Sequence, residues 1–232
     1  MTGFFDLSGS VKYLLYGIVS GMLLASAADT LILSGIITEQ VNIITASSYA
    51  LLIAICESAF VLFLLGRPRN VALRASPPFG WTLGLGIGAM QSSVLAFRLF
   101  DEELNSSLSG FSMYSVATCL LISVTACTGH AVLAAYQGAM ILEPQRLGPF
   151  FSTSIFRAAL LISLILSIYT PLILVAPLTA IVAAWAPSQE RWLPSGLTPA
   201  ARQAYRRTTR QSARHRIASS SRTRGSMVDE QE

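Results

Sequence analysis

The stretch VNIITASSYALLIAICESAFVLFLLG, residues 41–66, decides the fold. It contains a single charged side chain, Glu57, in a run that is otherwise apolar or weakly polar. The hydrocarbon core of a bilayer is about 30 Å thick, and a helix needs roughly 20 apolar residues to cross it. The stretch is therefore typical of a membrane-spanning helix, and it places an ionisable group inside that helix.

The same composition extends over most of the chain. Residues 12–186 carry only a handful of charges, and the whole chain is 53% hydrophobic and 12% charged, which does not fit a soluble core of this length. The first apolar run, residues 13–37, is too long for the core of a cleavable signal peptide. Further apolar runs cover residues 79–100, 111–142 and 150–186. The sequence thus predicts an all-α, polytopic integral membrane helical bundle over residues 1–186.

The number of helices depends on the run 150–186. It has Tyr169, Thr170 and Pro171 at its middle, so it forms either one long kinked helix or two short helices around a turn. Lys and Arg collect on the cytoplasmic side of membrane proteins. The basic segments of this chain can share that side only if the number of crossings is even. They are Lys12, the arginines of residues 67–74 and the basic tail. Six helices with both termini cytoplasmic are therefore favoured, with five as the alternative.

Residues 187–232 differ in composition from the bundle. Nine of the sixteen basic residues lie at or after Arg191, and the segment has too few large apolar side chains to offset the entropy of ordering it. We expect a cytoplasmic, mostly disordered tail. Arginines near an anionic leaflet each gain about 1 kcal/mol, whereas nucleic-acid binding is not expected without aromatic residues to stack on bases. The candidates for binding anionic lipid headgroups are Arg206, Arg207, Arg210, Arg214 and Arg216.

Five polar residues within the apolar runs are candidate functional groups, because ionisable side chains at membrane depth are costly. Counting about 1.5 Å per helical residue places four of them in one mid-membrane layer and the fifth, Asp29, on its outer side. The set could outline a polar route across much of the bilayer, or it could hold a buried ion pair that only fixes helix register. The five are Asp29, Glu57, Gln91, His130 and Arg157.

Small residues indicate where helices pack closely. Gly17 and Gly21, like Gly84 and Gly88, have the four-residue spacing that lets helix backbones approach in lipid. The second pair lies inside a predicted span with no strand before it, so it is not read as a nucleotide-binding loop. No disulfide, metal or other cofactor is expected, because the cysteines fall in apolar runs without metal-binding spacing; they are Cys56, Cys119 and Cys127.

Three short stretches resemble known families, each over a small part of the chain. The sequence Ala-Cys-Thr-Gly at 126–129 resembles the cysteine motif of exosortase and archaeosortase transpeptidases, which implies a Cys127 nucleophile with Arg146 and Arg157 as its arginines. Thr-Gly-His at 128–130 is similar to the Ser-Gly-His element of lipid phosphatases, which implies phosphotransfer at His130. Glu57, late in the second helix of a hairpin, resembles the ion-binding carboxylate of rotary ATPase proteolipids.

These observations favour a multi-pass membrane protein that passes a small ion or solute, or couples a proton, through the layer of Glu57, Gln91 and His130. A non-catalytic membrane organiser or assembly subunit is the first alternative, with other membrane subunits as partners beside the lipid bilayer. An intramembrane enzyme using Cys127 or His130 is the second alternative, and the less favoured one.

Overall fold

The computed structural model describes residues 7–38, 41–101, 110–143 and 145–197, and separate positions between 200 and 219. Within these residues every regular element is a helix. The chain divides into a unit that ends at Gly196 and a second unit that begins at Leu197. The first unit is the helical bundle, as the composition predicts.

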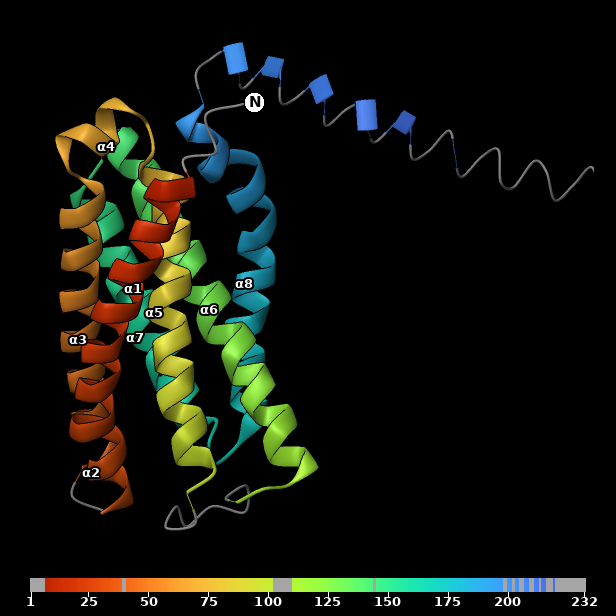
Figure 1. Ribbon diagram of the computed structural model, residues 1–232. Coiled ribbons are helices and arrows are strands. Elements are labelled where there is room, and N and C mark those ends of the chain that lie inside the picture. The colour runs from red at the N-terminus through yellow and green to blue at the C-terminus, as the bar shows by residue number, and fades with distance from the viewer. Residues whose placement is uncertain are drawn as a thin grey trace, which may run out of the picture. The chain divides into compact units, whose positions relative to one another are not determined.

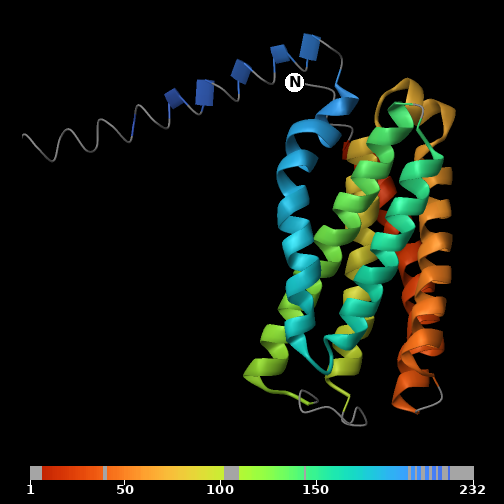
Figure 2. The same ribbon diagram turned by 180° about the vertical axis from the view of Figure 1, so that it is seen from behind.

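Six long helical stretches form the bundle (Figures 1 and 2). The short α4 (Pro68–Ala72) joins the second stretch to the third. Two stretches are composite: α1 is followed by a π-helical segment and a short helix, and α8 is preceded and followed by short turns of other helix types. In chain order the stretches are α1 (Leu7–Ala28) with η1 (Asp29–Leu33) and α2 (Ser34–Ile37); α3 (Ile43–Leu65); α5 (Ser76–Leu99); α6 (Met113–Leu142); α7 (Leu147–Leu166); and η2 (Pro171–Leu174) with α8 (Val175–Pro187), η3 (Ser188–Trp192) and η4 (Leu193–Gly196).

Five of these stretches are long and apolar enough to cross a membrane, namely residues 7–37, 43–65, 113–142, 147–166 and 171–196. The sixth, α5, is 24 residues long and packs mainly against α1 and α6. The run 150–186 forms two helices, since α7 ends at Leu166 and Pro171 opens the next helical segment. The all-α bundle and the two-helix interpretation of this run are therefore confirmed, and a single kinked helix over the run is wrong; that all six stretches cross the membrane stays a prediction.

The last stretch continues ten residues beyond the expected boundary at Ala186. Its π-helical end packs on α6, where the rings of Tyr136 and Trp192 have centroids 4.9 Å apart. Beyond it, the described positions between 200 and 219 are helical, and Arg207 and Arg214 are exposed. Three of the five candidate lipid-binding arginines lie outside the described residues, so the disorder of the tail stays a prediction; they are Arg206, Arg210 and Arg216.

The ends of α3 show why the helices begin and end where they do. Asn42 caps the first turn, because its Oδ1 accepts a hydrogen bond from the backbone N–H three residues later at 2.9 Å. At the other end the Asn70 side chain donates to the Leu64 carbonyl at 2.8 Å. The Ser76 hydroxyl donates to the Leu65 carbonyl at 2.9 Å. Side chains thus satisfy backbone groups that a helix end leaves open within an apolar medium.

Glycines bring α5 close to both of its neighbours. A Cβ at Gly17 or Gly21 would run into the α5 backbone, and one at Gly84 or Gly88 would run into the α6 backbone. At Gly88 the added atom would lie 2.5 Å from the Ala126 carbonyl oxygen. Both glycine pairs from the sequence therefore lie at close backbone contacts, and α5 is held between α1 and α6.

The buried interior consists of two apolar clusters with a polar layer between them. On α3, Ile53 belongs to one cluster and Val61 to the other, and Glu57 lies midway between them. Gln91 on α5 and His130 on α6 occupy the same intermediate position on their helices. The polar layer is therefore closed above and below by apolar side chains.

The arginine-rich loop and the end of the last stretch lie at the same end of the bundle. In Figure 1, α4 is at one end and α2 is at the other. Arg74, whose φ is +53°, follows α4, and its Nη2 donates to the Ser195 carbonyl at 2.9 Å. The end that carries α4 is called the basic end below, and the end that carries α2 is called the opposite end.

Candidate functional site

Glu57 is the centre of the polar layer. Its side chain is 2% exposed, and its Oε1 lies 2.7 Å from His130 Nδ1 and 2.8 Å from Arg157 Nε. The three residues come from α3, α6 and α7. A carboxylate buried at this depth is stable only with such partners.

Arg157 extends the layer toward the basic end. Its side chain is fully buried, and Nη1 donates to Ser58 Oγ at 2.7 Å and to Gln137 Oε1 at 3.0 Å. Gln137 Nε2 donates in turn to the Ser58 carbonyl at 2.9 Å. The Nε–H is close to Glu57 but not directed at its oxygen, so this contact is an ion pair without a good hydrogen bond, and Nη2 has no hydrogen-bond partner among the described residues.

His130 connects Glu57 to Gln91. Its Nε2 lies 2.8 Å from Gln91 Oε1, so both ring nitrogens have partners in the layer. The other arm of the Gln91 amide, Nε2, is buried and has no partner in the part of the chain that is described. The polar layer therefore includes a fourth helix, α5, and ends at the Gln91 Nε2–H group, which donates to none of the described residues.

A second ion pair lies nearer the opposite end. Asp29 opens the π-helical segment η1, and Arg98, in the last turn of α5, bonds it through two parallel contacts of 2.8 Å. Arg98 also lies 3.5 Å from Asp101 and 3.4 Å from the Ser34 hydroxyl. The Arg98 and Asp29 side chains are 27% and 20% exposed. This pair is bidentate, which is the strong geometry for arginine and carboxylate.

A small cavity lies between the two polar sites. Asp29 and Gln91 both line it, together with apolar side chains of α1, α5 and α7. Its volume is about 10 Å³, which is roughly the room that one water molecule occupies.

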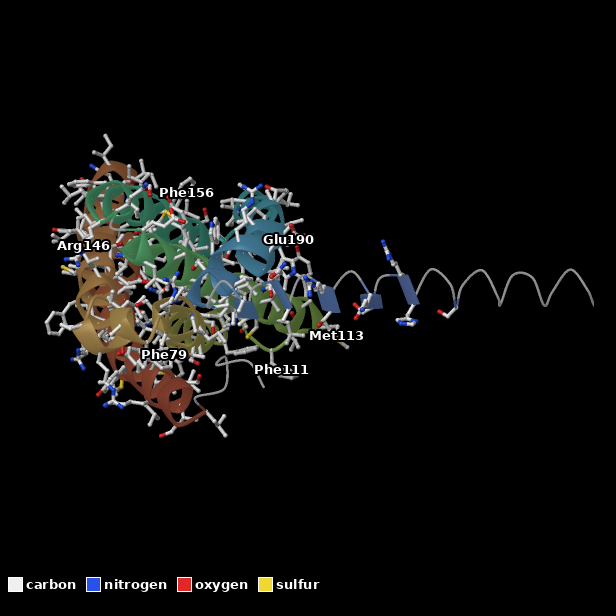
Figure 3. The ribbon with its side chains drawn as sticks, turned by 90° about the horizontal axis from the view of Figure 1, so that it is seen from above. Phe79, Phe111, Met113, Arg146, Phe156 and Glu190 are labelled. Atoms are coloured by element: carbon white, nitrogen blue, oxygen red, sulfur yellow. The ribbon has the colours of Figure 1, made fainter. Side chains whose placement is uncertain are left out.

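A larger cavity of about 740 Å³ lies among α6, α7 and the last stretch. Phe156 of α7 and Glu190, beyond α8, mark the side of the bundle away from α1 in Figure 3. The walls are mainly apolar or small, and Thr153 is one of them. The Thr153 hydroxyl donates to the Pro149 carbonyl at 2.8 Å and lies 3.5 Å from Gln137 Oε1. One hydroxyl therefore belongs both to this apolar cavity and to the edge of the polar layer.

No protein family, curated protein or solved structure matches this chain. Function is therefore inferred from the polar groups and their surroundings.

The structure brings four of the five candidate residues into one hydrogen-bonded or ion-paired group, and it places Asp29 apart with Arg98. The sequence reading missed four participants, although helix periodicity carries a signal for three of them. Each of the three lies on the same helix face as a predicted residue: Gln137 is seven residues after His130, Arg98 is seven after Gln91, and Thr153 is four before Arg157. The fourth is Ser58, next to Glu57.

The geometry does not favour catalysis at Cys127 or His130. Both nitrogens of His130 are engaged by Glu57 and Gln91. Arg157 is bound within the layer, and Arg146 is an exposed residue at the start of α7, so the two arginines do not gather around Cys127. Among the described residues, no three His, Cys, Asp or Glu side chains are arranged to hold a metal ion.

Proposed function

We propose that this protein is a proton-coupled membrane transport protein whose proton site is the Glu57 layer. The observation that carries the proposal is the contact of one buried carboxylate oxygen with both His130 and Arg157 at mid-bundle. Ionisable groups at this depth in membrane proteins mark proton relays and ion pathways. Glu57 and His130 are the two members of the layer whose side chains can gain or lose a proton, since Arg157 keeps its charge in proteins, and they are hydrogen-bonded to each other.

The transported charge is a proton rather than a larger ion or a polar solute. The space beside Gln91 holds about one water, and apolar clusters close the layer on both sides. A proton needs only a chain of hydrogen bonds, whereas a metal cation or a solute needs room and several ligands. The small cavity and Asp29 continue the chain of polar groups toward the opposite end.

Each residue of the layer has its own role in this proposal. His130 and Glu57 exchange the proton along their 2.7 Å contact. Arg157 does not release a proton in proteins, so it supplies a fixed positive charge beside the carboxylate. Gln137 orients Arg157, and Thr153 lies where the layer meets the apolar cavity.

The test is proton flux into vesicles that contain the purified protein and a pH-sensitive dye, under an imposed pH gradient. Glu57→Gln keeps the side-chain volume and removes the titratable group, so we expect loss of flux with retained insertion. Glu143→Gln, the same change at an exposed residue after α6, is the matched control and should keep wild-type flux. Unchanged flux in Glu57→Gln would refute the proposal.

The closed geometry of the same layer favours a second candidate, a non-catalytic membrane organiser. Glu57, His130 and Arg157 tie three helices together through contacts within the layer. If the protein is an organiser, Glu57→Gln leaves the buried Arg157 charge without its counter-charge and destabilises the bundle. Adding Arg157→Gln removes that uncompensated charge and restores stability. Rescue of thermal stability by the double variant, with no flux from any form including wild type, selects the organiser.

We propose that the basic end faces the cytoplasm, because it carries the arginines of residues 67–74 together with Arg146 and Arg191. At the opposite end Arg98 is neutralised by Asp29 and Asp101. A cysteine at Ser220 should react with a membrane-impermeant reagent only after the cells are permeabilised. Labelling of intact cells would place the tail outside and contradict this orientation.

A further inference from the structure

We propose that the large cavity among α6, α7 and the last stretch is a lipid-binding site, which holds one acyl chain of a phospholipid from the surrounding bilayer. This inference goes beyond the proposed function and does not depend on proton transport. It rests on the way α8 is held, on the chemistry of the cavity walls and on the side where the cavity opens.

The helix α8 is fixed near both of its ends. On the side of the opposite end, Leu174 is fully buried in one of the two apolar clusters. Toward the basic end, Trp185 packs against Trp81, and Trp192 packs against Tyr136. None of the 13 residues of α8 itself is buried. The space beside α8 therefore lies between two fixed ends of one helix, and it is a feature of the fold.

The walls of this cavity offer little to a polar ligand. No charged residue is among the described residues that line it. Three lining residues of α7 carry hydroxyl groups, and each hydroxyl donates to a carbonyl of its own helix; they are Ser152, Thr153 and Ser163. The occupant must therefore be held mainly by apolar contacts.

The size of the cavity also calls for an apolar occupant. Its volume of about 740 Å³ falls within the range of about 300–1,000 Å³ that is typical of ligand pockets. Water is not favoured between apolar walls, and an empty space of this size would forfeit the dispersion contacts of every side chain around it. An apolar molecule recovers those contacts.

The cavity opens on the lipid-facing surface of the bundle. Phe156 lines it from α7 and is 58% exposed. Ala176 and Ala180 line it from α8 and are also exposed. Both helices belong to stretches that are long and apolar enough to cross a membrane, so the medium at the opening is bilayer hydrocarbon. An acyl chain from that bilayer is the occupant at hand.

The cavity has the direction and the length of an acyl chain. Its lining on α7 runs from Ser152 to Ser163, which is about 16 Å along the helix axis at roughly 1.5 Å per residue. One leaflet of the hydrocarbon core is about 15 Å thick. Tyr136 and Trp192 line the part toward the basic end, and such amphipathic rings are typical of the headgroup level. The phospholipid headgroup is therefore placed toward the basic end, with the chain along α7 and α8.

Thr153 is the residue at which the acyl chain meets the polar layer. Its hydroxyl lies 3.5 Å from Gln137 Oε1, which accepts a hydrogen bond from Arg157 Nη1 at 3.0 Å. A chain in the cavity places hydrocarbon beside this edge of the layer. The lipid thus supplies the apolar wall on the side where the protein leaves a cavity.

The experiment is native mass spectrometry of the detergent-purified full chain after incubation with palmitoyl-oleoyl phosphatidylcholine. We expect one phospholipid bound per chain. Ala180→Phe on α8 and Ala159→Phe on α7 place a ring in the cavity from its two sides, and each should lower the bound fraction at least tenfold. Ala186→Phe, at an exposed alanine of α8 that does not line the cavity, is the matched control and should keep the lipid.

Melting in the same detergent separates a filled cavity from a misfolded chain. Bound lipid should raise the melting temperature of the wild type by about 5 °C, because a ligand of the native state stabilises it. Ala180→Phe should melt no lower than the lipid-free wild type and should gain nothing from added lipid. Ala159→Phe, on a different helix, keeps the test decisive if Ala180→Phe destabilises the bundle.

The source of the acyl chain is tested by offering palmitate in place of the phospholipid. Preferential binding of palmitate would overturn the phospholipid and indicate a free fatty acid as the ligand. Equal lipid binding by the wild type and by both cavity variants would place the lipid on the outer surface and overturn the site. Absence of bound lipid, together with melting that lipid does not change, would also overturn it.

Discussion

The two ion-pair sites of the bundle have the same arginine–carboxylate distance of 2.8 Å but differ in burial and in hydrogen-bond geometry. The Glu57 site is 0–2% exposed and shares one carboxylate oxygen between His130 and Arg157. The Asp29–Arg98 site is 20–27% exposed, uses both carboxylate oxygens and has further polar neighbours. The more buried site therefore has the poorer hydrogen-bond geometry, and the more exposed site has the better one.

This difference indicates different roles. A pair selected for stability alone would be expected to have well-directed hydrogen bonds, as Asp29 and Arg98 do in their bidentate contact. At the Glu57 site the Arg157 Nε–H is misdirected, and donors of Arg157 and Gln91 lack partners among the described residues. Strain and unsatisfied groups concentrate at functional sites. The comparison supports an anchoring role at Asp29 and an active role at Glu57.

The largest effect should come from removing one partner at each site with the same substitution. Arg157→Gln removes the fixed positive charge beside Glu57 in an apolar interior and leaves the carboxylate with His130 alone, so we expect a loss of about 3–5 kcal/mol. Arg98→Gln leaves Asp29 partly hydrated, so we expect a loss of about 1 kcal/mol or less. Thermal unfolding of both variants in the same detergent measures the difference. Equal losses would show that burial does not separate the two sites.

The next effect concerns the helix contact that positions His130. A Cβ at Gly84 would overlap the His130 carbonyl oxygen, which is backbone and cannot move aside cheaply. We expect Gly84→Ala to cost about 1–3 kcal/mol, as overpacked sites do, and to weaken the contact of His130 with Gln91.

Gly148→Ala is the matched control for this prediction. A Cβ at Gly148 meets nothing within 4 Å, so the change should be neutral or slightly stabilising in the first turn of α7. Melting in detergent compares the two variants. A neutral Gly84→Ala would contradict the close approach of α5 and α6.

A smaller effect separates the sites by their response to salt. Asp29→Asn removes an ion pair that is partly exposed, so we expect it to cost up to about 1 kcal/mol at low ionic strength and less at high salt. The cost of Arg157→Gln should not change with salt, because ions do not reach the buried layer. Unfolding in low and high sodium chloride tests both. Salt sensitivity at Arg157 would indicate that water reaches the polar layer.

The contrast between the sites also explains what the sequence could predict. Three residues of the Glu57 site are conspicuous in the sequence because each interrupts an apolar helix; they are Glu57, His130 and Arg157. Their positions along the predicted helices, at about 1.5 Å per residue, indicate a common depth in the membrane. Arg98 lies in the last turn of α5, where a basic residue resembles an ordinary flanking charge. Its pairing with Asp29 depends on the π-helical turn at Asp29, which changes the angular position of the residues around it.

The end of the bundle was hard to predict for a related reason. Residues 188–191 are polar, so composition alone assigns them to the tail. Trp185 packs against Trp81, with ring centroids 5.7 Å apart, and Trp192 packs against Tyr136. These aromatic contacts between distant parts of the chain hold the last stretch to α5 and α6 as far as Gly196, and a local window of sequence contains no information about them.

The smallest effect on bundle stability is expected from removing the tail. Residues from 197 onward form a unit separate from the bundle, so deletion of residues 200–232 should leave the melting temperature of the bundle unchanged.

The same deletion should abolish binding of the tail to anionic lipid, because each tail arginine gains about 1 kcal/mol near an anionic leaflet. A peptide of residues 202–224 should bind vesicles containing phosphatidylserine, release at high salt, and fail to bind vesicles of neutral lipid. Equal binding to both kinds of vesicle would remove the electrostatic role of the tail, and a lower melting temperature after deletion would show that the tail stabilises the bundle.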